Sequence, residues 1–332
     1  MSKEKNMDLE KNVYQKEKLE QKPTRNGYGQ GLVELGKRSE DVVVLCADLT
    51  GSTRSAMFQK EFPDRFIQVG IAEQNMLSIA AGLAFSGKVP FVSTYGVFCP
   101  GRNWDQLRVN VCYSKANVKL TGAHTGVSVG PDGATHQALE DIAITRCLPN
   151  MTVLAPCDMI ETKKATIAAG EIKGPVYLRF AREATPIFTT VKTPFQIGQA
   201  EVFKQGKDVS VIACGPTVHE ALLAAHDLAK ENISVAVVNN HTIKPMDEKT
   251  IIEAAKTGAV VTAEDHQVMG GLGSAVAEVL ATSLPAGRQV PMEMIAVQDR
   301  FGESGQPEEL MKEYGLLAED IKQAIKKVIK RK

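Results

Sequence analysis

The sequence has no excess of charge of either sign and no long apolar run. Lysine plus arginine and aspartate plus glutamate each number 39 in 332 residues, so no overall charge draws the chain to nucleic acid or to an anionic membrane. No apolar stretch approaches the roughly 18 residues that a membrane-spanning helix needs. Residues 1–22 are rich in charge and lack the apolar segment of a signal peptide, so they predict a solvated or frayed helix. We expect no nucleic-acid and no membrane partner.

The sequence also lacks the residue spacings that hold metals or disulfide frameworks. Its six cysteines are scattered, with no CxxC pair among them. They are typical of reduced thiols, and we therefore expect a cytoplasmic protein. No HExxH or similarly compact ligand motif is present. None of the residues of this chain is predicted to bind a metal.

What the chain does have is a regular alternation of apolar strands with amphipathic helices. This pattern predicts mainly parallel sheets covered on both faces, and the length leads us to expect two domains. Prolines and a run of threonines interrupt the alternation near residues 186–199, which we interpret as a linker. The predicted fold is α/β with two doubly wound domains: a charged tail at 1–22, a first domain at 23–185, and a second, smaller domain at 200–332.

One carboxylate stands at the start of a predicted helix, directly after a short apolar strand. Strand Phe66–Val69 leads through Gly70 into a helix rich in alanine that begins at Glu73. A glutamate in this position is ordinarily a charge that complements the helix dipole. The other interpretation is a buried acid that exchanges a proton with a ligand nitrogen. The sequence G-I-A-E-Q-N-M resembles the pyrimidine-binding motif of thiamine-diphosphate enzymes, and this favours the second role.

Two aromatic residues follow the next strand, at the sheet edge where ligands collect. Tyr95 and Phe98 leave strand Pro90–Thr94 and enter a Pro-Gly turn. Taken alone, such rings are more often core packing. Beside Glu73, they would provide a stacking platform for a flat pyrimidine whose edge meets the carboxylate.

The densest polar stretch is the glycine-rich segment 122–137, which contains His124, Asp132 and His136. A metal site is the rival interpretation, but the spacings match no compact ligand motif. Imidazoles beside an aspartate suit a hydroxyl-rich substrate, because they donate to oxygens and transfer protons near neutral pH. Arg182 follows strand Val176–Phe180 and would hold a phosphate or a carboxylate, although a single arginine is ordinarily solvated surface.

These motifs together resemble the C-terminal half of transketolase, and specifically the separate C-terminal subunit of transketolases split into two chains. The resemblance covers about residues 23–331. The motifs that carry it are G-I-A-E-Q-N-M, S-T-Y-G-V-F, H-T-G-V-S-V-G-P-D-G-A-T-H-Q, N-N-H-T-I-K-P, T-A-E-D-H and F-G-E-S-G-Q-P-E-E-L. The resemblance implies a pyrimidine-binding domain followed by a transketolase C-terminal domain.

The resemblance also implies roles for individual residues. Glu73 would share a proton with the cofactor pyrimidine, Phe98 would stack on it, and Ile71 and Tyr95 would line its pocket. The implied sugar-phosphate contacts are His124, Arg182, Arg25 and Ser52. The implied contacts to substrate hydroxyls are Asp132 and His136, which share the catalytic role with Glu73.

This chain departs from the family pattern at two positions of the glycine-rich segment. The usual glutamate before Asp132 is Pro131 here, and the usual proline after the following glycine is Ala134. Both changes affect the backbone geometry of the segment and leave its polar groups in place.

The resemblance implies transketolase activity with thiamine diphosphate, in the pentose phosphate pathway. A two-carbon ketol unit would pass from a ketose phosphate such as xylulose 5-phosphate to an aldose phosphate. The family anchors the diphosphate and Mg²⁺ or Ca²⁺ through a Gly-Asp-Gly motif followed by an Asn-Asn, and here no Gly-Asp-Gly precedes Asn239-Asn240. An N-terminal partner subunit would supply that part, in an α2β2 heterotetramer.

Three alternatives compete with this assignment. Deoxyxylulose-phosphate synthase and the β-subunit of a 2-oxo-acid dehydrogenase belong to the same cofactor class. The synthase resembles D-R-A-G where this chain has A-H-T-G at 123–126, which favours transketolase. The third alternative is a non-catalytic assembly subunit, against which the intact set Glu73, Phe98, Asp132 and His136 argues.

Overall fold

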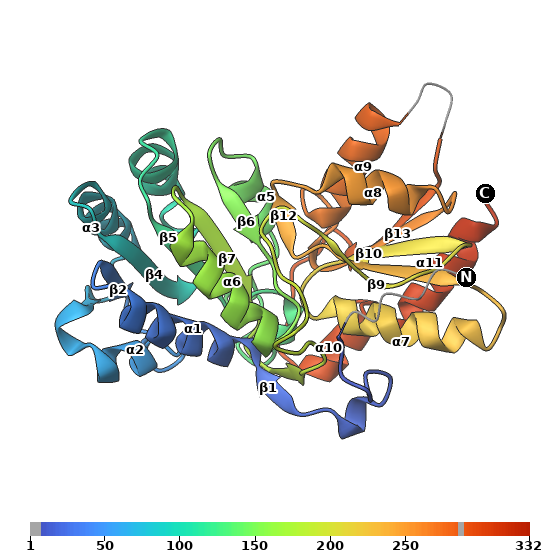
Figure 1. The fold of residues 1–332 in the computed structure, drawn as a ribbon, viewed down its shortest axis with the longest axis horizontal. Coiled ribbons are helices and arrows are strands. Elements are labelled where there is room, and N and C mark those ends of the chain that lie inside the picture. Colours follow the sequence, from blue (N-terminus) through green and yellow to red (C-terminus); the bar gives the residue numbers. More distant parts are fainter. Residues whose placement is uncertain (1–7, 285–288) are drawn as a thin grey trace.

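The computed structural model describes residues 8–284 and 289–332, which form two α/β units lying side by side (Figure 1). The amino-terminal unit, in blue and green, occupies the left of the view, and the carboxy-terminal unit, in yellow to red, occupies the right. Parallel strands alternate with helices in both, which confirms the predicted class of two α/β domains. No helix of the described ranges is long and apolar enough to cross a membrane.

A mostly parallel sheet forms the centre of the first unit. Its strand order is β12 (Thr242–Lys244), β6 (Thr152–Leu154), β7 (Val176–Phe180), β5 (Lys119–Ala123), β4 (Val89–Tyr95), β2 (Val42–Cys46) and β3 (Phe66–Gln68). The strand β12 comes from the second unit of the chain and pairs antiparallel with β6. The two units are therefore joined by backbone hydrogen bonds as well as by side chains.

Helices cover both faces of this sheet because its strand side chains alternate between two apolar clusters. Val42 and Val44 belong to one cluster, and Val43 and Leu45 belong to the other. The first face carries α1 (Thr24–Arg38), α2 (Ala56–Glu61) and α6 (Met159–Glu171). The second face carries α3 (Glu73–Phe85), α4 (Trp104–Gln106) with its π-helical continuation Leu107–Tyr113, and α5 (Asp141–Arg146).

Close packing of α1 on α6 sets the position of the first residues of α1. A Cβ atom added at Gly27 would lie 2.0 Å from the carbonyl oxygen of Met159, so only glycine allows this approach. Thr24 is the first helical residue of α1, directly after Pro23. Its hydroxyl donates to the carbonyl of Ala181 at 3.0 Å, which ties the start of α1 to the end of β7.

The second unit repeats the arrangement around a smaller sheet. Its strand order is β14 (Met292–Val297), β13 (Val260–Gln267), β10 (Val209–Ala213), β11 (Val235–Asn239) and the antiparallel β9 (Glu201–Lys204). The helices are α7 (Thr217–Ala229) and α11 (Ala318–Ile329) on one face, α8 (Glu248–Ala255) and α9 (Leu272–Ser283) on the other, and α10 (Pro307–Glu313) beside the first unit.

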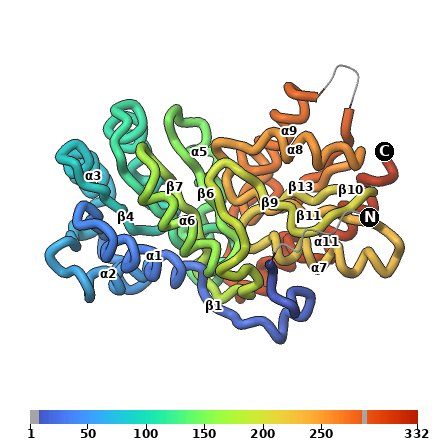
Figure 2. Tube along the Cα trace, in the orientation of Figure 1, coloured from blue at the N-terminus to red at the C-terminus, as the bar shows by residue number. Residues whose placement is uncertain are grey.

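The amino-terminal segment lies against the second unit before the chain enters the first (Figure 2). Val13 and Leu19 are buried in the apolar cluster that contains residues of α7 and α11. The ring of His219 on α7 lies with Nε2 2.8 Å from the carbonyl oxygen of Val13. The expectation of a solvated or frayed helix is therefore wrong for this segment, because its few apolar side chains find a core. Residues 1–7 of the predicted tail lie outside the described residues.

The predicted linker is also packed onto the protein. The strand β8 (Ala184–Pro186) pairs antiparallel with β1 (Gln21–Pro23). Beyond it, the backbone N–H groups of Phe188 and Thr189 donate to the carboxylate of Asp158, at 3.0 and 2.7 Å. The connection between the units is thus held by a buried acid at the start of α6.

Candidate functional site

Glu73 is the first residue of α3, and only 1% of its side chain is exposed. The chain reaches it through Gly70, whose φ of 71° turns the backbone out of β3 and into the helix. The carbonyl of Glu73 accepts a hydrogen bond from Nδ2 of Asn103 at 3.2 Å. A buried carboxylate is thereby fixed at a helix N-terminus, where the helix dipole stabilises its negative charge.

Arg102 provides the partner of this carboxylate, and the sequence interpretation assigned it no role. Its Nη1 donates to Oε2 of Glu73 at 2.9 Å, and its guanidinium lies 4.4 Å from the centre of the Phe98 ring. Within the described ranges, Oε1 of Glu73 accepts no hydrogen bond. Arg102 is 47% exposed, so the acid meets its partner on the solvent side.

The two predicted stacking rings lie together, and both predicted histidines join them. The rings of Tyr95 and Phe98 are stacked, with centres 6.0 Å apart and an angle of 16° between their planes. The His136 ring meets Phe98 edge-on at 5.6 Å, and the His124 ring lies 4.1 Å from Tyr95. Tyr95 is buried and Phe98 is partly exposed, so Phe98 is the more accessible of the two rings.

Arg25 connects the first helix to two loops of the site. Its Nη1 donates to the carbonyl of Ser52 at 2.9 Å and lies 3.2 Å from Nε2 of His124. Burial, followed by the charges of Arg25 and Arg182, lowers the pKa of His124 to about 3, so its ring is neutral near pH 7. Nε2 is the ring nitrogen beside Arg25, and Nδ1 is a buried atom with no partner among the described residues. Burial, followed by Arg54 and Arg182, lowers the pKa of Arg25.

Arg182 follows the end of β7 and contacts the glycine-rich segment. Its Nη1 donates to the carbonyl of Val129 at 2.9 Å and lies 3.3 Å from Oδ1 of Asp132. In the same segment, Nδ1 of His136 lies 2.8 Å from the hydroxyl of Thr135. Arg182 and Arg25 therefore lie with His124 beside the acceptor Asp132, and the two guanidinium groups suit an anionic, hydroxylated ligand.

Ile71 lies two residues before Glu73 and is 73% exposed. Its predicted role in lining the pyrimidine pocket stays a prediction.

The residues present fit one end of thiamine diphosphate and not the other. A buried carboxylate with one free oxygen next to a partly exposed ring suits an aminopyrimidine, which offers a polar edge and a flat face. For the metal end, the described residues contain no group of three or more His, Cys, Asp and Glu side chains that could hold an ion. Asn239 is buried, and its amide donates to Glu161 at 2.6 Å, within the protein interior.

The fold and the arrangement of the site fit the pyrimidine-binding class of thiamine-diphosphate proteins. The chain matches the family models for the transketolase pyrimidine-binding domain over residues 20–187 and the transketolase C-terminal domain over residues 198–321. It belongs to the transketolase family and corresponds to the C-terminal section of a split enzyme.

Several relatives support this assignment. The chain is 47% identical, over 93% of its length, to a Methanocaldococcus jannaschii protein described as a transketolase C-terminal section, of which 97% is covered. It is 40% identical, over 95% of its length, to the 6-deoxy-6-sulfo-D-fructose transketolase subunit SqwH of a Clostridium species, with 97% of that subunit covered. Human transketolase is 42% identical over 92% of this chain, which spans 49% of that enzyme.

A solved structure agrees with these relatives. It is described as a split gene transketolase in the form of an inactive beta4 tetramer. It superimposes with a TM-score of 0.86 at 45% identity, covering 93% of this chain and 98% of the other.

Proposed function

We propose that this chain is the catalytic C-terminal subunit of a two-chain transketolase that transfers a two-carbon ketol unit between sugar phosphates. The observation that carries the proposal is the series of contacts that joins Glu73, through Arg102, Phe98 and Tyr95, to both histidines and Arg25, with the ion pair of Arg182 and Asp132 near His124. This cluster combines a pyrimidine half-site with side chains that would bind an anion.

Each of these side chains has a distinct task. Glu73 holds and exchanges a proton at a ring nitrogen of the pyrimidine, and Phe98 stacks against its face. Thiamine diphosphate, when bound, supplies the carbon nucleophile that the protein side chains lack. The rest of the chain selects and orients the sugar.

The substrate contacts divide into two groups. Arg25, Arg182 and the neutral His124 bind the phosphate end of the sugar, far from the bond that breaks. Asp132 and His136 contact hydroxyl groups next to the reacting carbons, where they orient the substrate and move protons. These roles follow the resemblance, and the grouping of the residues in the structure supports them.

A partner subunit is part of the proposal. The described residues offer a pyrimidine half-site without a metal-binding group, so an N-terminal subunit would hold the diphosphate with Mg²⁺ or Ca²⁺. The similar beta4 tetramer is described as inactive, which supports self-association of such chains and their dependence on a partner. We propose an α2β2 assembly in the pentose phosphate pathway. The free cysteines Cys46, Cys99, Cys112, Cys147, Cys157 and Cys214 support a cytoplasmic location.

A sulfonated sugar is the second candidate substrate. The relative SqwH is named as a subunit of a 6-deoxy-6-sulfo-D-fructose transketolase. The arginines and the neutral imidazole of this site bind oxyanions, and a sulfonate presents oxygens much as a phosphate does. We favour the phosphate because two arginines match a dianion better than a monoanion.

Calorimetry tests the partner requirement. The purified chain is titrated with thiamine diphosphate and Mg²⁺, alone and after mixing with the N-terminal subunit that carries Gly-Asp-Gly. We expect tight, metal-dependent binding only for the mixture, and loss of that binding in Phe98→Ala. Tight metal-dependent binding by the chain alone would contradict the proposal.

A further inference from the structure

The strand β13 ends in three consecutive polar residues that are almost completely buried, Glu264, Asp265 and His266, each at most 2% exposed. They belong to the motif T-A-E-D-H, which the proposed function leaves without a role. Buried carboxylates are costly unless hydrogen bonds satisfy them, so the groups that they bind indicate what they do.

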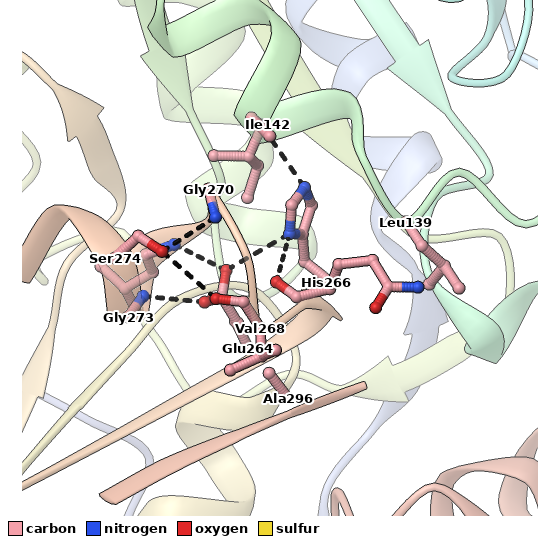
Figure 3. Close-up of polar contacts among 12 residues, drawn as sticks. Leu139, Ile142, Glu264, His266, Val268, Gly270, Gly273, Ser274 and Ala296 are labelled. Atoms are coloured by element: carbon pink, nitrogen blue, oxygen red, sulfur yellow. Dashed lines mark hydrogen bonds and ion pairs between the residues drawn. The ribbon is translucent and has the colours of Figure 1, made fainter. Parts of the chain in front are cut away.

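Glu264 serves the second unit alone. Its two carboxylate oxygens accept hydrogen bonds from the N–H groups of Leu272 and Gly273, at 2.7 and 2.8 Å, at the start of α9 (Figure 3). This carboxylate therefore caps a helix of its own domain.

His266 reaches the first unit. Its Nε2 accepts from the N–H of Ala143, at 3.4 Å, in the first turn of α5, and Nδ1 lies 2.8 Å from the carbonyl of Gln267 (Figure 3). The N–H of Gln267 donates in turn to the carbonyl of Leu139 at 2.8 Å. The end of β13 is thus bound to the stretch that follows the glycine-rich segment.

Asp265 binds the glycine-rich segment itself. Oδ1 accepts from the N–H of Val127 at 2.8 Å, and Oδ2 accepts from the hydroxyl of Ser128 at 2.7 Å and from its N–H at 3.4 Å. Gly126 has φ of 84°, and a Cβ atom there would lie 1.9 Å from Oδ2 of Asp265. The glycine therefore allows the backbone to approach the carboxylate closely.

The turn that Asp265 binds, Val127–Val129, lies between His124 and the pair Asp132 and His136. At its other end, the carbonyl of Val129 accepts from Arg182 at 2.9 Å. The negative carboxylate of Asp265 thus meets the N–H groups of the turn, and the positive guanidinium of Arg182 meets its carbonyl. Both charges are favourably oriented with respect to the peptide dipoles. Any shift of the turn would move the site side chains on both sides of it.

A second contact fixes Asp265. Its own carbonyl accepts from Nη2 of Arg179 at 2.7 Å, and Arg179 forms a buried ion pair with Asp141 at 2.9 Å. Arg179 lies on β7, three residues before Arg182. Asp265 therefore connects the glycine-rich segment to β7, the strand that leads to Arg182.

We propose that Asp265 is a positioning residue for substrate binding, by which the second unit holds the segment that carries His124, Asp132 and His136 in its binding geometry. This inference rests on the proposed function, because it assigns the second unit a part in sugar binding. It predicts that loss of the Asp265 carboxylate weakens sugar binding while the pyrimidine half-site, which it does not contact, is retained.

Hydrogen exchange of the isolated chain tests the contact without any assay of activity. We compare Asp265→Asn with Glu264→Gln, a neighbour of equal burial whose hydrogen bonds stay within the second unit. Asp265→Asn should speed amide exchange of Val127 and Ser128 by about tenfold or more, the effect of losing a hydrogen bond to a charged group. Glu264→Gln should instead speed exchange at Leu272 and Gly273.

Kinetics of the reconstituted complex test the consequence. Asp265→Asn should raise KM for the donor sugar by about tenfold, from the loss of one such hydrogen bond, with the Kd for thiamine diphosphate unchanged. Glu264→Gln should leave KM unchanged, even if both variants lose thermal stability. Ser128→Ala is the milder second variant, should Asp265→Asn fail to fold, and it should also raise KM.

Two results would overturn the inference. One is unchanged exchange at Val127 and Ser128 in Asp265→Asn. The other is an equal rise of KM in Asp265→Asn and Glu264→Gln, which would indicate a general loss of stability. Complete inactivity of the wild-type complex toward sugars would contradict the proposed function, and the exchange result would still decide whether Asp265 holds the segment.

Discussion

The buried carboxylate of Glu73 and the guanidinium of Arg102 form an ion pair of 2.9 Å, and Arg102 also covers the ring of Phe98 at 4.4 Å. The acid and the stacking ring of the pyrimidine half-site are thus connected through one side chain. Because Arg102 is 47% exposed and Glu73 only 1%, the pair lies at the boundary between solvent and core. A ligand that enters here meets the arginine and the acid together.

The first prediction concerns this pair in the isolated chain. Arg102→Met keeps much of the side-chain volume but leaves a buried charge without its partner, so the free energy of unfolding should fall by about 1–2 kcal/mol after allowing for solvent screening. Glu73→Gln should remove most of that penalty when combined with Arg102→Met. Urea denaturation of the wild type, both single variants and the double variant measures the coupling. Strictly additive effects would show that the pair is not coupled.

The second prediction concerns turnover. In the reconstituted complex, Glu73→Gln keeps the shape and removes the proton exchange, so kcat should fall by roughly 10²–10⁴, the usual range for a positioned acid or base. Glu61→Gln, at the exposed end of α2, is the control and should behave as the wild type. Near-normal turnover of Glu73→Gln would reduce this residue to a charge at a helix start.

The third prediction separates the two groups of substrate contacts. Arg182→Ala and His124→Ala should chiefly raise KM, because these side chains bind the anionic end in both the ground and the transition state. Asp132→Ala and His136→Ala should also lower kcat, because they act beside the reacting carbons. Steady-state kinetics with varied ketose phosphate distinguish the two groups. A pure kcat defect in Arg182→Ala would exclude its role as the phosphate contact.

Much of the fold could be predicted because buried parallel strands and their helices leave a clear pattern. The strand Val176–Phe180 and the start of the helix at Glu73 are found as predicted, since each combines an apolar run with a distinct boundary residue. The strand β12 could not be predicted, because its three residues form a strand only by pairing with β6 in the other unit. The packing of Val13 and Leu19 depends in the same way on a distant core.

The candidate site likewise contains some residues that the sequence predicts and others that it does not. Glu73, Tyr95 and Phe98 follow strands in the sequence, so the geometry of a parallel sheet brings them to one edge. The role of Arg102 could not be predicted, because its position depends on how the turn at 99–101 directs the chain back over Phe98, which no local pattern specifies. Asp265 lies far away in the sequence, and only the contact between the two units reveals the turn that it binds.

The fourth prediction concerns pH and stability. Burial lowers the pKa of His219 from 6.5 to about 4, so the unfolded chain takes up this proton at higher pH than the folded chain. The contribution of the neutral ring to the free energy of unfolding is therefore complete above pH 6.5, and it is lost as the pH falls toward 4. The difference in unfolding free energy between wild type and His219→Gln should shrink by about 1.4 kcal/mol per pH unit in that window.

Urea unfolding of both proteins at pH 7.5, 6.5 and 5.5 measures this difference. Carboxylates that titrate in the same range are shared by the two proteins, so their contributions cancel. The glutamine amide of the variant can still donate to the carbonyl of Val13, which His219 contacts at 2.8 Å. A difference that stays constant over the three pH values would show that His219 titrates alike in the folded and the unfolded chain.

The proposed function requires that this chain catalyses two-carbon transfer between sugars only together with an N-terminal subunit. The most direct measurement mixes the two purified chains with thiamine diphosphate and Mg²⁺ and supplies xylulose 5-phosphate with ribose 5-phosphate. Parallel reactions contain pyruvate with glyceraldehyde 3-phosphate, or 6-deoxy-6-sulfofructose as donor. We expect transfer from xylulose 5-phosphate that saturates at equal amounts of the two chains and is absent from either chain alone. Turnover by this chain alone, or activity confined to pyruvate, would contradict it.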